Sequence, residues 1–326
     1  CEYKVLGVKK GERTKKPPLP FRTSTLQQEA SKHLNFSTQK TMRLAQQLYE
    51  GVDIKGSGTV GLITYLRTDS TRVSEEAEAA ASEYISANYG ADYVGGSVDT
   101  KKNTAKIQDA HEAIRPSDVT RTPASVKDSL SRDQFRLYQL IWKRFVASRM
   151  QAAKYETTSV KIGAGDYRFH VAASKIVFEG FRQVYVDADE EKEKANVLVK
   201  SLDTSSVLEK ESFDYQQHFT KPPAHYTEAG LVKTLEELGI GRPSTYAPTI
   251  STIIARRYVA KENKNLYLTE LGEVVNNMMK HSFESIVDVN FTANMEGLLD
   301  CVAEGKVDWK TVVRNFYPDL EEAVQK

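Results

Sequence analysis

The sequence predicts a multidomain protein of mixed α and β structure, with two mainly helical sections on either side of a β-rich one. Its 326 residues are enough for two or three domains. Apolar residues recur at helical spacing up to about Tyr155, alternate with polar residues in the next section, and return to helical spacing from Thr227 onward. We therefore expect the order helical, β, helical along the chain.

The first helical section contains four segments with helical periodicity. Two of them share residues 25–49 and are separated near Asn35, and a third follows Ser74, a typical N-cap, and runs to about Tyr89. The fourth, residues 133–153, carries a stripe that we expect to be core and not a cofactor site: Phe135, Tyr138, Ile141, Trp142 and Phe145.

Short runs in which apolar and polar residues alternate, bounded by Gly and Asp, predict the β-rich section. The expected strands are Thr157–Ile162, Tyr167–Ala172, Lys175–Phe178, Gln183–Val186 and Val207–Tyr215. Another strand at Tyr3–Val8 precedes a basic, proline-containing stretch, residues 9–20, that we expect to be an extended connector.

The last section predicts four helices, at Glu228–Leu238, Ser244–Arg256, Leu271–Met279 and Asn294–Ala303. Gly239 ends the first helix and Pro243 suits the start of the second, which is the pattern of a helix-turn-helix. Residues 258–268, with a turn at 262–265, resemble the β wing of a winged helix. Such helix pairs often serve only for packing.

Composition limits the class of protein. Hydrophobic residues make up 40% of the chain and charged residues 27%, and no apolar run reaches 18 residues, so we expect a globular, cytoplasmic protein without a membrane span. The two cysteines, Cys1 and Cys301, exclude a four-cysteine zinc finger. Because the net charge is only +1, a surface that binds nucleic acid must come from a local cluster of basic residues.

The densest polar cluster is residues 63–71, Ile-Thr-Tyr-Leu-Arg-Thr-Asp-Ser-Thr. If residues 62–66 form a strand, Tyr65 and Arg67 share one face and Leu66 lies on the other. A guanidinium beside a phenol lowers the cost of forming phenolate and can hold a phosphate oxygen. A Tyr/Arg pair on a strand is also common in purely structural roles.

A second cluster, residues 110–118, contains His111 and Arg115. In a helix these two side chains would lie one turn apart, offering a proton-transfer group and a second anion clamp. The second histidine of a zinc-protease helix is missing. A structural histidine is the alternative.

Three segments together resemble a known family. Residues 61–71 resemble the active-site tyrosine motif of the type IA DNA topoisomerases, and residues 111–116 resemble their second signature. Residues 218–223 and 239–247, the latter Gly-Ile-Gly-Arg-Pro-Ser-Thr-Tyr-Ala, resemble the DNA-contacting segment of the bacterial topoisomerase I branch. The three motifs occur in the family's order over residues 61–258.

The resemblance implies an ATP-independent transesterification. Tyr65 would attack a phosphodiester of single-stranded DNA and become joined to the 5′ phosphate, leaving a 3′ hydroxyl that reverses the reaction. Arg67 would stabilise the charge of the transition state, and His111 would orient or protonate groups nearby. The residues expected to bind DNA are Thr68, Asp69, Ser70, Arg115, Arg242, Ser244, Thr245, Tyr246 and Arg256.

The resemblance also implies Mg²⁺, held by an N-terminal toprim domain. No such domain precedes Cys1, so we expect no metal site in this chain, which would be a fragment that cannot relax supercoils alone. The acids at 187–191 are an unsuitable substitute, because the run continues Lys-Glu-Lys and resembles a solvated loop.

For the fold, the resemblance implies two helical lobes with winged-helix-like elements, joined by a discontinuous β arch. The arch or hinge would be residues 1–24 and 151–220, the lobe carrying Tyr65 residues 25–150, and the base with the DNA groove residues 221–326. We expect a monomer associated with the nucleoid and preferring single-stranded DNA. The alternative is a non-catalytic helix-turn-helix module that binds single strands, which would not need Tyr65 as a nucleophile.

Overall fold

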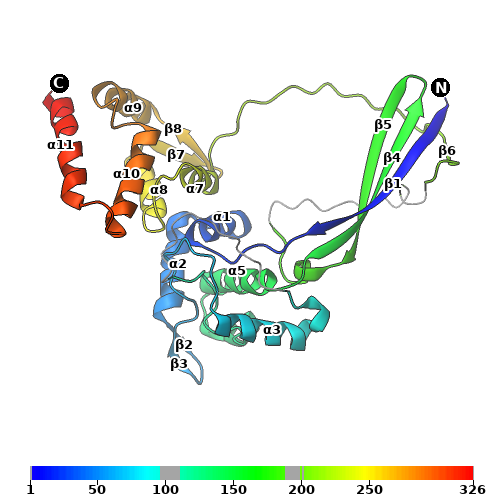
Figure 1. Cartoon of the computed structure of the whole chain (residues 1–326), viewed down its shortest axis with the longest axis horizontal. Helices are drawn as coiled ribbons and strands as arrows, with labels where there is room; N and C mark the ends of the chain where they lie inside the picture. The colour runs from blue at the N-terminus through cyan, green and yellow to red at the C-terminus, as the bar shows by residue number, and fades with distance from the viewer. Residues whose placement is uncertain (1, 96–110, 188–198, 200–201, 326) are drawn as a thin grey trace. The chain divides into compact units, whose positions relative to one another are not determined.

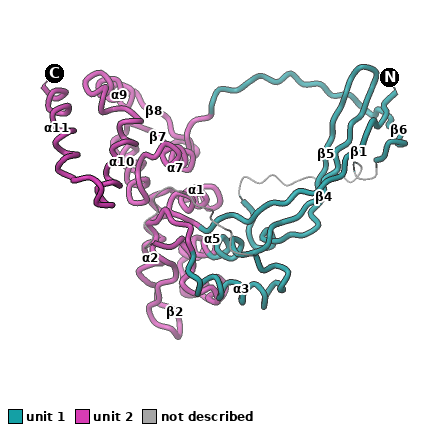
Figure 2. The backbone as a smooth tube through the Cα atoms, in the orientation of Figure 1, with its two compact units in different colours: residues 1–20, 73–103, 142–223 teal, residues 21–72, 104–141, 224–326 magenta. Residues whose placement is uncertain are grey.

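A computed structural model describes residues 2–95, 111–187, 199 and 202–325. The chain forms two compact units, each assembled from segments that are distant in sequence (Figure 2). Unit 1 comprises residues 1–20, 73–103 and 142–223, and unit 2 comprises residues 21–72, 104–141 and 224–326. Helix and sheet are both present, as expected, whereas the division into three domains stays a prediction.

The sheet of unit 1 is antiparallel, with strand order β5-β4-β1-β6 (Figure 1). Its strands are β1 (Tyr3–Lys15), β4 (Ala153–Ala164), β5 (Tyr167–Phe178) and β6 (Val207–Leu208). Alternate residues of β1, β4 and β5 point to one face, where Val5, Val160 and Ala173 form a core with Val199. This packing explains why the alternating sequence forms a sheet.

Several strand predictions need correction. The basic stretch expected to be a connector is part of β1, because it pairs with β4 as far as Lys15. Two predicted strands form the single strand β5, and only the first two residues of the one expected from Val207 to Tyr215 are paired. In place of the strand expected at Gln183–Val186, a 3₁₀ turn, η3, covers Gly180–Gln183.

Unit 1 also contains α3 (Glu75–Tyr89), the 3₁₀ turn η1 (Ala91–Tyr93) and the second half of α5 (Arg132–Ser148). Ser74 caps α3 as predicted, since its Oγ accepts from the Ala77 N–H at 3.4 Å. Helix α5 ends at Ser148, five residues before the predicted end. Four members of its expected core stripe, Tyr138, Ile141, Trp142 and Phe145, are buried.

Unit 2 begins with α1 (Thr23–Leu34) and α2 (Thr38–Glu50), which are separated by Asn35 in a left-handed conformation. The hairpin β2 (Val52–Ile54) and β3 (Gly58–Val60) and the short turns α4 (Pro123–Val126) and η2 (Lys127–Ser129) follow.

The C-terminal part of unit 2 contains the predicted helix pair, as α7 (Glu228–Glu237) and α8 (Tyr246–Ala255). The predicted hairpin is present as β7 (Val259–Glu262) and β8 (Asn265–Leu268). Three helices complete the unit: α9 (Glu270–Ser282), α10 (Val289–Ala303) and α11 (Trp309–Gln325). The sequence prediction missed α11 and began α10 five residues late.

Within unit 2, α1 packs on α7 and α2 packs on α8. The Glu228 carboxylate, at the start of α7, links this helix to α2 and β7. It accepts from the N–H and the hydroxyl of Thr38 at 2.7 and 3.0 Å and from the Lys261 ammonium at 2.6 Å. Among the described residues, no helix has both the length and the apolar character needed to cross a bilayer.

Candidate active site

The polar cluster around Tyr65 is extended chain and not a regular strand. Only Ile63 forms a bridge, with Pro116, so the strand predicted over residues 62–66 is wrong. Side chains nevertheless alternate between exposed and buried from Tyr65 to Ser70. The exposed side chains are those of Tyr65, Arg67 and Asp69. Leu66, Thr68 and Ser70 are buried and anchor the segment.

Thr23, the first residue of α1, fixes this segment by side-chain hydrogen bonds. Its Oγ1 donates to the carbonyls of Leu66 and Thr68, at 2.7 and 3.0 Å, and accepts from the Thr68 N–H at 2.9 Å. Thr23 is fully buried, so these bonds are shielded from water. The backbone on both sides of Arg67 is therefore held against the start of α1.

Two aromatic rings flank Tyr65, whose side chain is 40% exposed. The Tyr49 ring meets it edge to face, with centroids 5.5 Å apart, and the His111 ring lies at 5.4 Å and 50°. These contacts restrict the phenol while leaving it open to a ligand. The structure thus brings together Tyr65 and His111, two of the three predicted catalytic residues.

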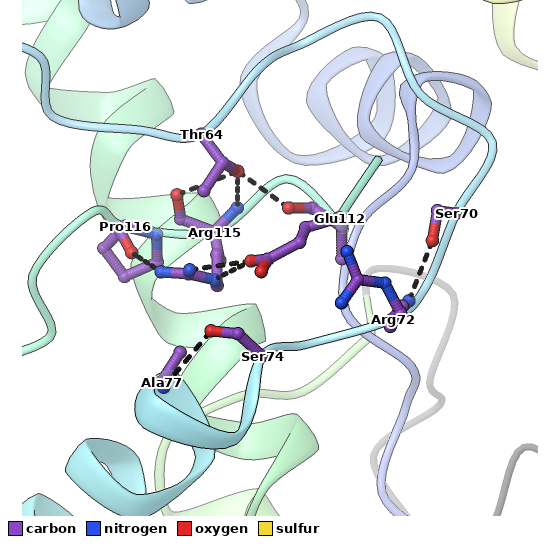
Figure 3. A network of polar contacts seen from close by, with 9 residues as sticks. Thr64, Ser70, Arg72, Ser74, Ala77, Glu112, Arg115 and Pro116 are labelled. Atoms are coloured by element: carbon purple, nitrogen blue, oxygen red, sulfur yellow. Dashed lines mark hydrogen bonds and ion pairs between the residues drawn. The ribbon is translucent and has the colours of Figure 1, made fainter. Parts of the chain in front are cut away.

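The described part of the second cluster, residues 111–118, is not helical, so the condition under which His111 and Arg115 would lie one helical turn apart is not met. Ile114 bridges to Phe21, and the Arg115 carbonyl accepts from the Thr64 N–H at 3.0 Å. Thr64 Oγ1 donates to the Ala113 carbonyl at 2.7 Å and accepts from the Arg115 N–H at 3.0 Å (Figure 3). The two signature segments are thereby paired with each other.

The Arg115 guanidinium contacts neighbouring residues of the second cluster. It contacts the Glu112 carboxylate at 2.7 and 2.8 Å and donates to the Pro116 carbonyl at 3.0 Å (Figure 3). Its predicted role as a phosphate clamp stays a prediction.

A tight turn between α7 and α8 presents the third motif. Gly241 has φ +81°, and a Cβ there would lie 3.2 Å from both the Thr245 hydroxyl and the Tyr246 ring. The Arg242 N–H donates to Thr245 Oγ1 at 2.8 Å, which closes the turn before α8. The motif's glycine and threonine thus shape the backbone, while Ser244 remains exposed.

A cavity of about 790 Å³ in unit 2 unites these segments. Its lining includes eight of the predicted site residues, Tyr65, Arg67, Thr68, Asp69, His111, Arg242, Ser244 and Tyr246, together with Glu236, Gly239, Gly241, Pro243 and Asp300. Ser70, Thr245 and Arg115 do not line it. Arg256 is the C-cap of α8, about 15 Å along the helix from Tyr246.

Two carboxylates that the sequence prediction missed hold arginines at this cavity. The Asp300 carboxylate accepts from Arg242 Nη2 at 2.8 Å, and the Glu236 carboxylate pairs with Arg22 at 2.9 Å and accepts from the Ser24 hydroxyl at 2.7 Å. Burial and the charge of Glu236 raise the pKa of Tyr246 to about 12, so this phenol is neutral near pH 7.

Arg67 differs in this respect from Arg22 and Arg242. Within the described residues no hydrogen bond or ion pair engages its exposed guanidinium. A cation without a carboxylate partner beside an accessible phenol is suited to an incoming anion such as a phosphodiester.

The carboxylates of the described residues do not form a magnesium site. No group of three potential metal ligands occurs in the described parts of the chain. Three carboxylates line the cavity, those of Asp69, Glu236 and Asp300, and the last two are already paired with arginines. Most of the acidic run at 187–191 lies outside the described residues, and Asp187 pairs with Arg144 at 3.2 Å.

Comparison with known proteins agrees with this geometry. Residues 1–314 match the family model described as DNA topoisomerase. Full-length topoisomerase I from Thermotoga maritima has a similar structure, with a TM-score of 0.83 and 39% sequence identity. The match covers 99% of this chain and 52% of that one, so the chain spans about half the length of the solved relative. By the extent of both matches, the chain belongs to the DNA topoisomerase family, in its bacterial type IA group.

Proposed function

We propose that this chain supplies the nucleophile and the single-strand groove of an ATP-independent type IA topoisomerase that relaxes negatively supercoiled DNA. The observation that carries the proposal is one cavity whose lining includes Tyr65, Arg67 and His111 together with Arg242 and Ser244. A nucleophile, an uncompensated cation and a DNA-contacting turn thus face the same space.

The chemistry is an exchange of one phosphodiester for another. The Tyr65 hydroxyl oxygen attacks phosphorus and loses its proton, while the bond from phosphorus to the 3′ oxygen breaks and that oxygen gains a proton. The 5′ phosphate remains esterified to Tyr65, and the reverse attack restores the strand. Because one ester replaces another, no ATP is needed.

Each neighbouring side chain has a distinct part in this proposal. Arg67 holds a non-bridging oxygen, where negative charge increases in the transition state. His111, whose ring lies 5.4 Å from the phenol ring at a tilt of 50°, would exchange a proton with the phenol or hold the phosphate. Arg242 and Ser244 bind the DNA backbone in the same cavity. Mg²⁺ would be bound by a toprim domain outside this chain and would supply charge neutralisation at the phosphate.

The finer architectural proposal follows the same resemblance. The hairpin of β7 and β8 after α8 supports a winged-helix-like base, and the long strands of β1, β4 and β5 support a β arch that serves as hinge. We further propose a monomer that binds single-stranded DNA at the nucleoid.

The decisive experiment uses the full-length gene product that contains these residues. DNA labelled on the 3′ side of the cleavage site should become attached to the wild-type protein in denaturant-resistant form. Tyr65→Phe removes only the hydroxyl and should abolish the adduct while single-strand binding survives. An adduct that persists in Tyr65→Phe would place the nucleophile elsewhere, and wild-type binding without any adduct would favour the alternative, a non-catalytic binding module.

A further inference from the structure

A second, smaller crevice adjoins the candidate active site. It has a volume of about 310 Å³ and lies in unit 2 where α2 faces α8. Its lining is Gln39, Met42, Arg67, Pro243, Ser244, Ala247, Pro248 and Ser251. Arg67, Pro243 and Ser244 line both spaces, so the crevice opens at the side chain proposed to bind the reacting phosphate.

The two spaces differ in charge. Asp69, Glu236 and Asp300 line the main cavity, whereas the crevice lining contains no acid, and Arg67 is its one charged side chain. The part of the crevice near Arg67 can therefore bind an anion. The rest of its lining is uncharged and suits a neutral group.

The crevice walls suit an aromatic heterocycle. Met42 presents a polarizable thioether, which makes favourable contacts with aromatic rings, and Pro243, Ala247 and Pro248 add apolar surface. Its volume is at the lower end of the range for small-ligand sites, about 300–1,000 Å³.

Two polar side chains of the crevice, Ser251 and Gln39, can form hydrogen bonds with a ligand. The Ser251 hydroxyl donates to the Pro248 carbonyl at 3.0 Å, which leaves its oxygen free to accept. Among the described residues, the Gln39 amide has no hydrogen-bond partner. An amide that both donates and accepts, beside a hydroxyl acceptor, can bind the edge of a nucleobase.

From these observations we infer that the crevice is a nucleobase subsite, which holds the base next to the phosphate bound by Arg67. The inference rests on the proposed function, because the phosphate must lie in the main cavity. It assigns α2 a direct contact with the substrate and makes Met42, Gln39 and Ser251 determinants of base binding.

The test uses the 326-residue chain and two fluorescent strands of equal length, one of ordinary nucleotides and one of abasic residues. Ser251→Phe fills the crevice, and the matched control Thr252→Phe adds the same ring at an exposed position on α8 that lines neither space. Since a stacked base contributes on the order of 10-fold in affinity, Ser251→Phe should weaken binding of the ordinary strand about 10-fold and leave the abasic strand unchanged. Thr252→Phe should change neither.

Equal affinity of Ser251→Phe and wild type for the ordinary strand would overturn the subsite, as would equal weakening for both strands. The proposed function fails separately, if the wild-type chain binds neither strand. A second measurement avoids reliance on folding of the variant: a strand containing 4-thiothymidine is photocrosslinked to the wild-type chain and the adduct is mapped. Crosslinks to residues 39–42 or 247–251 support the subsite, and crosslinks confined to other segments contradict it.

Discussion

Arg242, the arginine of the third signature segment, donates from Nη2 to the Asp300 carboxylate of α10 at 2.8 Å. Its Nη1 lies 3.5 Å from Glu296, whose other oxygen accepts from the Gly241 N–H at 3.1 Å. A DNA phosphate that binds Arg242 must therefore compete with two carboxylates one helical turn apart.

We expect Asp300→Asn to strengthen single-strand binding. The substitution removes the competing charge and frees Arg242, for which an increase of about 3- to 10-fold at low salt is consistent with the worth of a partly exposed ion pair. Fluorescence anisotropy with a labelled oligonucleotide measures the effect. Glu304→Gln, the same loss of one charge at the C-cap of α10, is the control. Equal gains in both variants would mean that net charge, and not Arg242, is responsible.

Arg67→Ala should reduce DNA cleavage by the full-length protein by a factor on the order of 10² or more, as does removal of a donor that stabilises a transition-state oxyanion. Arg67→Lys should restore only part of the activity, since a point charge does not reproduce the guanidinium fork. Adduct formation in single turnover is the measurement. Arg72→Ala, in the same segment but outside the cavity lining, should cleave normally. Loss in both variants would indicate a general defect.

Thr23→Val should destabilise the protein by about 1–3 kcal/mol, because it keeps the shape but leaves buried backbone groups near Arg67 unpaired. Denaturant unfolding followed by circular dichroism gives the value. The exposed Thr249→Val on α8 serves as comparison and should be close to neutral. If the two variants were equally stable, the hydrogen bonds of Thr23 would be unimportant for the fold.

Stability should fall between about pH 10 and pH 12 in part because of Tyr246. Its pKa is raised in the folded protein to about 12 from the ordinary 10.0, so the unfolded chain releases this proton first as pH rises. The stabilisation is complete below pH 10 and is lost towards pH 12. Tyr246→Phe should therefore show a shallower decline in unfolding free energy over this window than wild type. The exposed Tyr317→Phe should retain the wild-type decline.

Gln27→Leu should raise stability by about 1–3 kcal/mol, since neither polar atom of the buried Gln27 amide has a hydrogen-bond partner in the part of the chain that the structure describes. Leucine has similar volume and removes that cost. Thermal unfolding measures the change, with Gln46→Leu as control, because the Gln46 amide donates to Glu50 at 2.6 Å on the surface of α2. A destabilised Gln27→Leu would show that the amide has a partner in solution.

Local signals in the sequence predicted much of the fold. Ser74 as a cap, the aromatic stripe of α5, and the turn between α7 and α8 depend on residues near one another in the chain, and all three are present. The motifs also predicted Tyr65 and His111 as neighbours, and their rings are in contact.

What the sequence did not predict depends on contacts between distant residues. Asp300 is 58 positions from Arg242, and Thr23 is 45 positions from Thr68, so no periodicity links either pair. The helical interpretation of His111 and Arg115 failed for the same reason. Residues 113–117 pair with the backbone of Phe21, Leu62, Thr64 and Arg72, and those distant partners favour the extended form over a helix.

The buried Glu228 carboxylate has a consequence for the order of folding. Its donors are 190 and 33 residues away, in α2 and β7, and a buried carboxylate without donors is strongly unfavourable. The first turn of α7 can therefore become buried only when α2 and β7 are in contact with it. Packing of this helix thus depends on closing a long loop of the chain. We therefore expect α2, α7 and β7 to become structured together, despite the long stretch of chain between them.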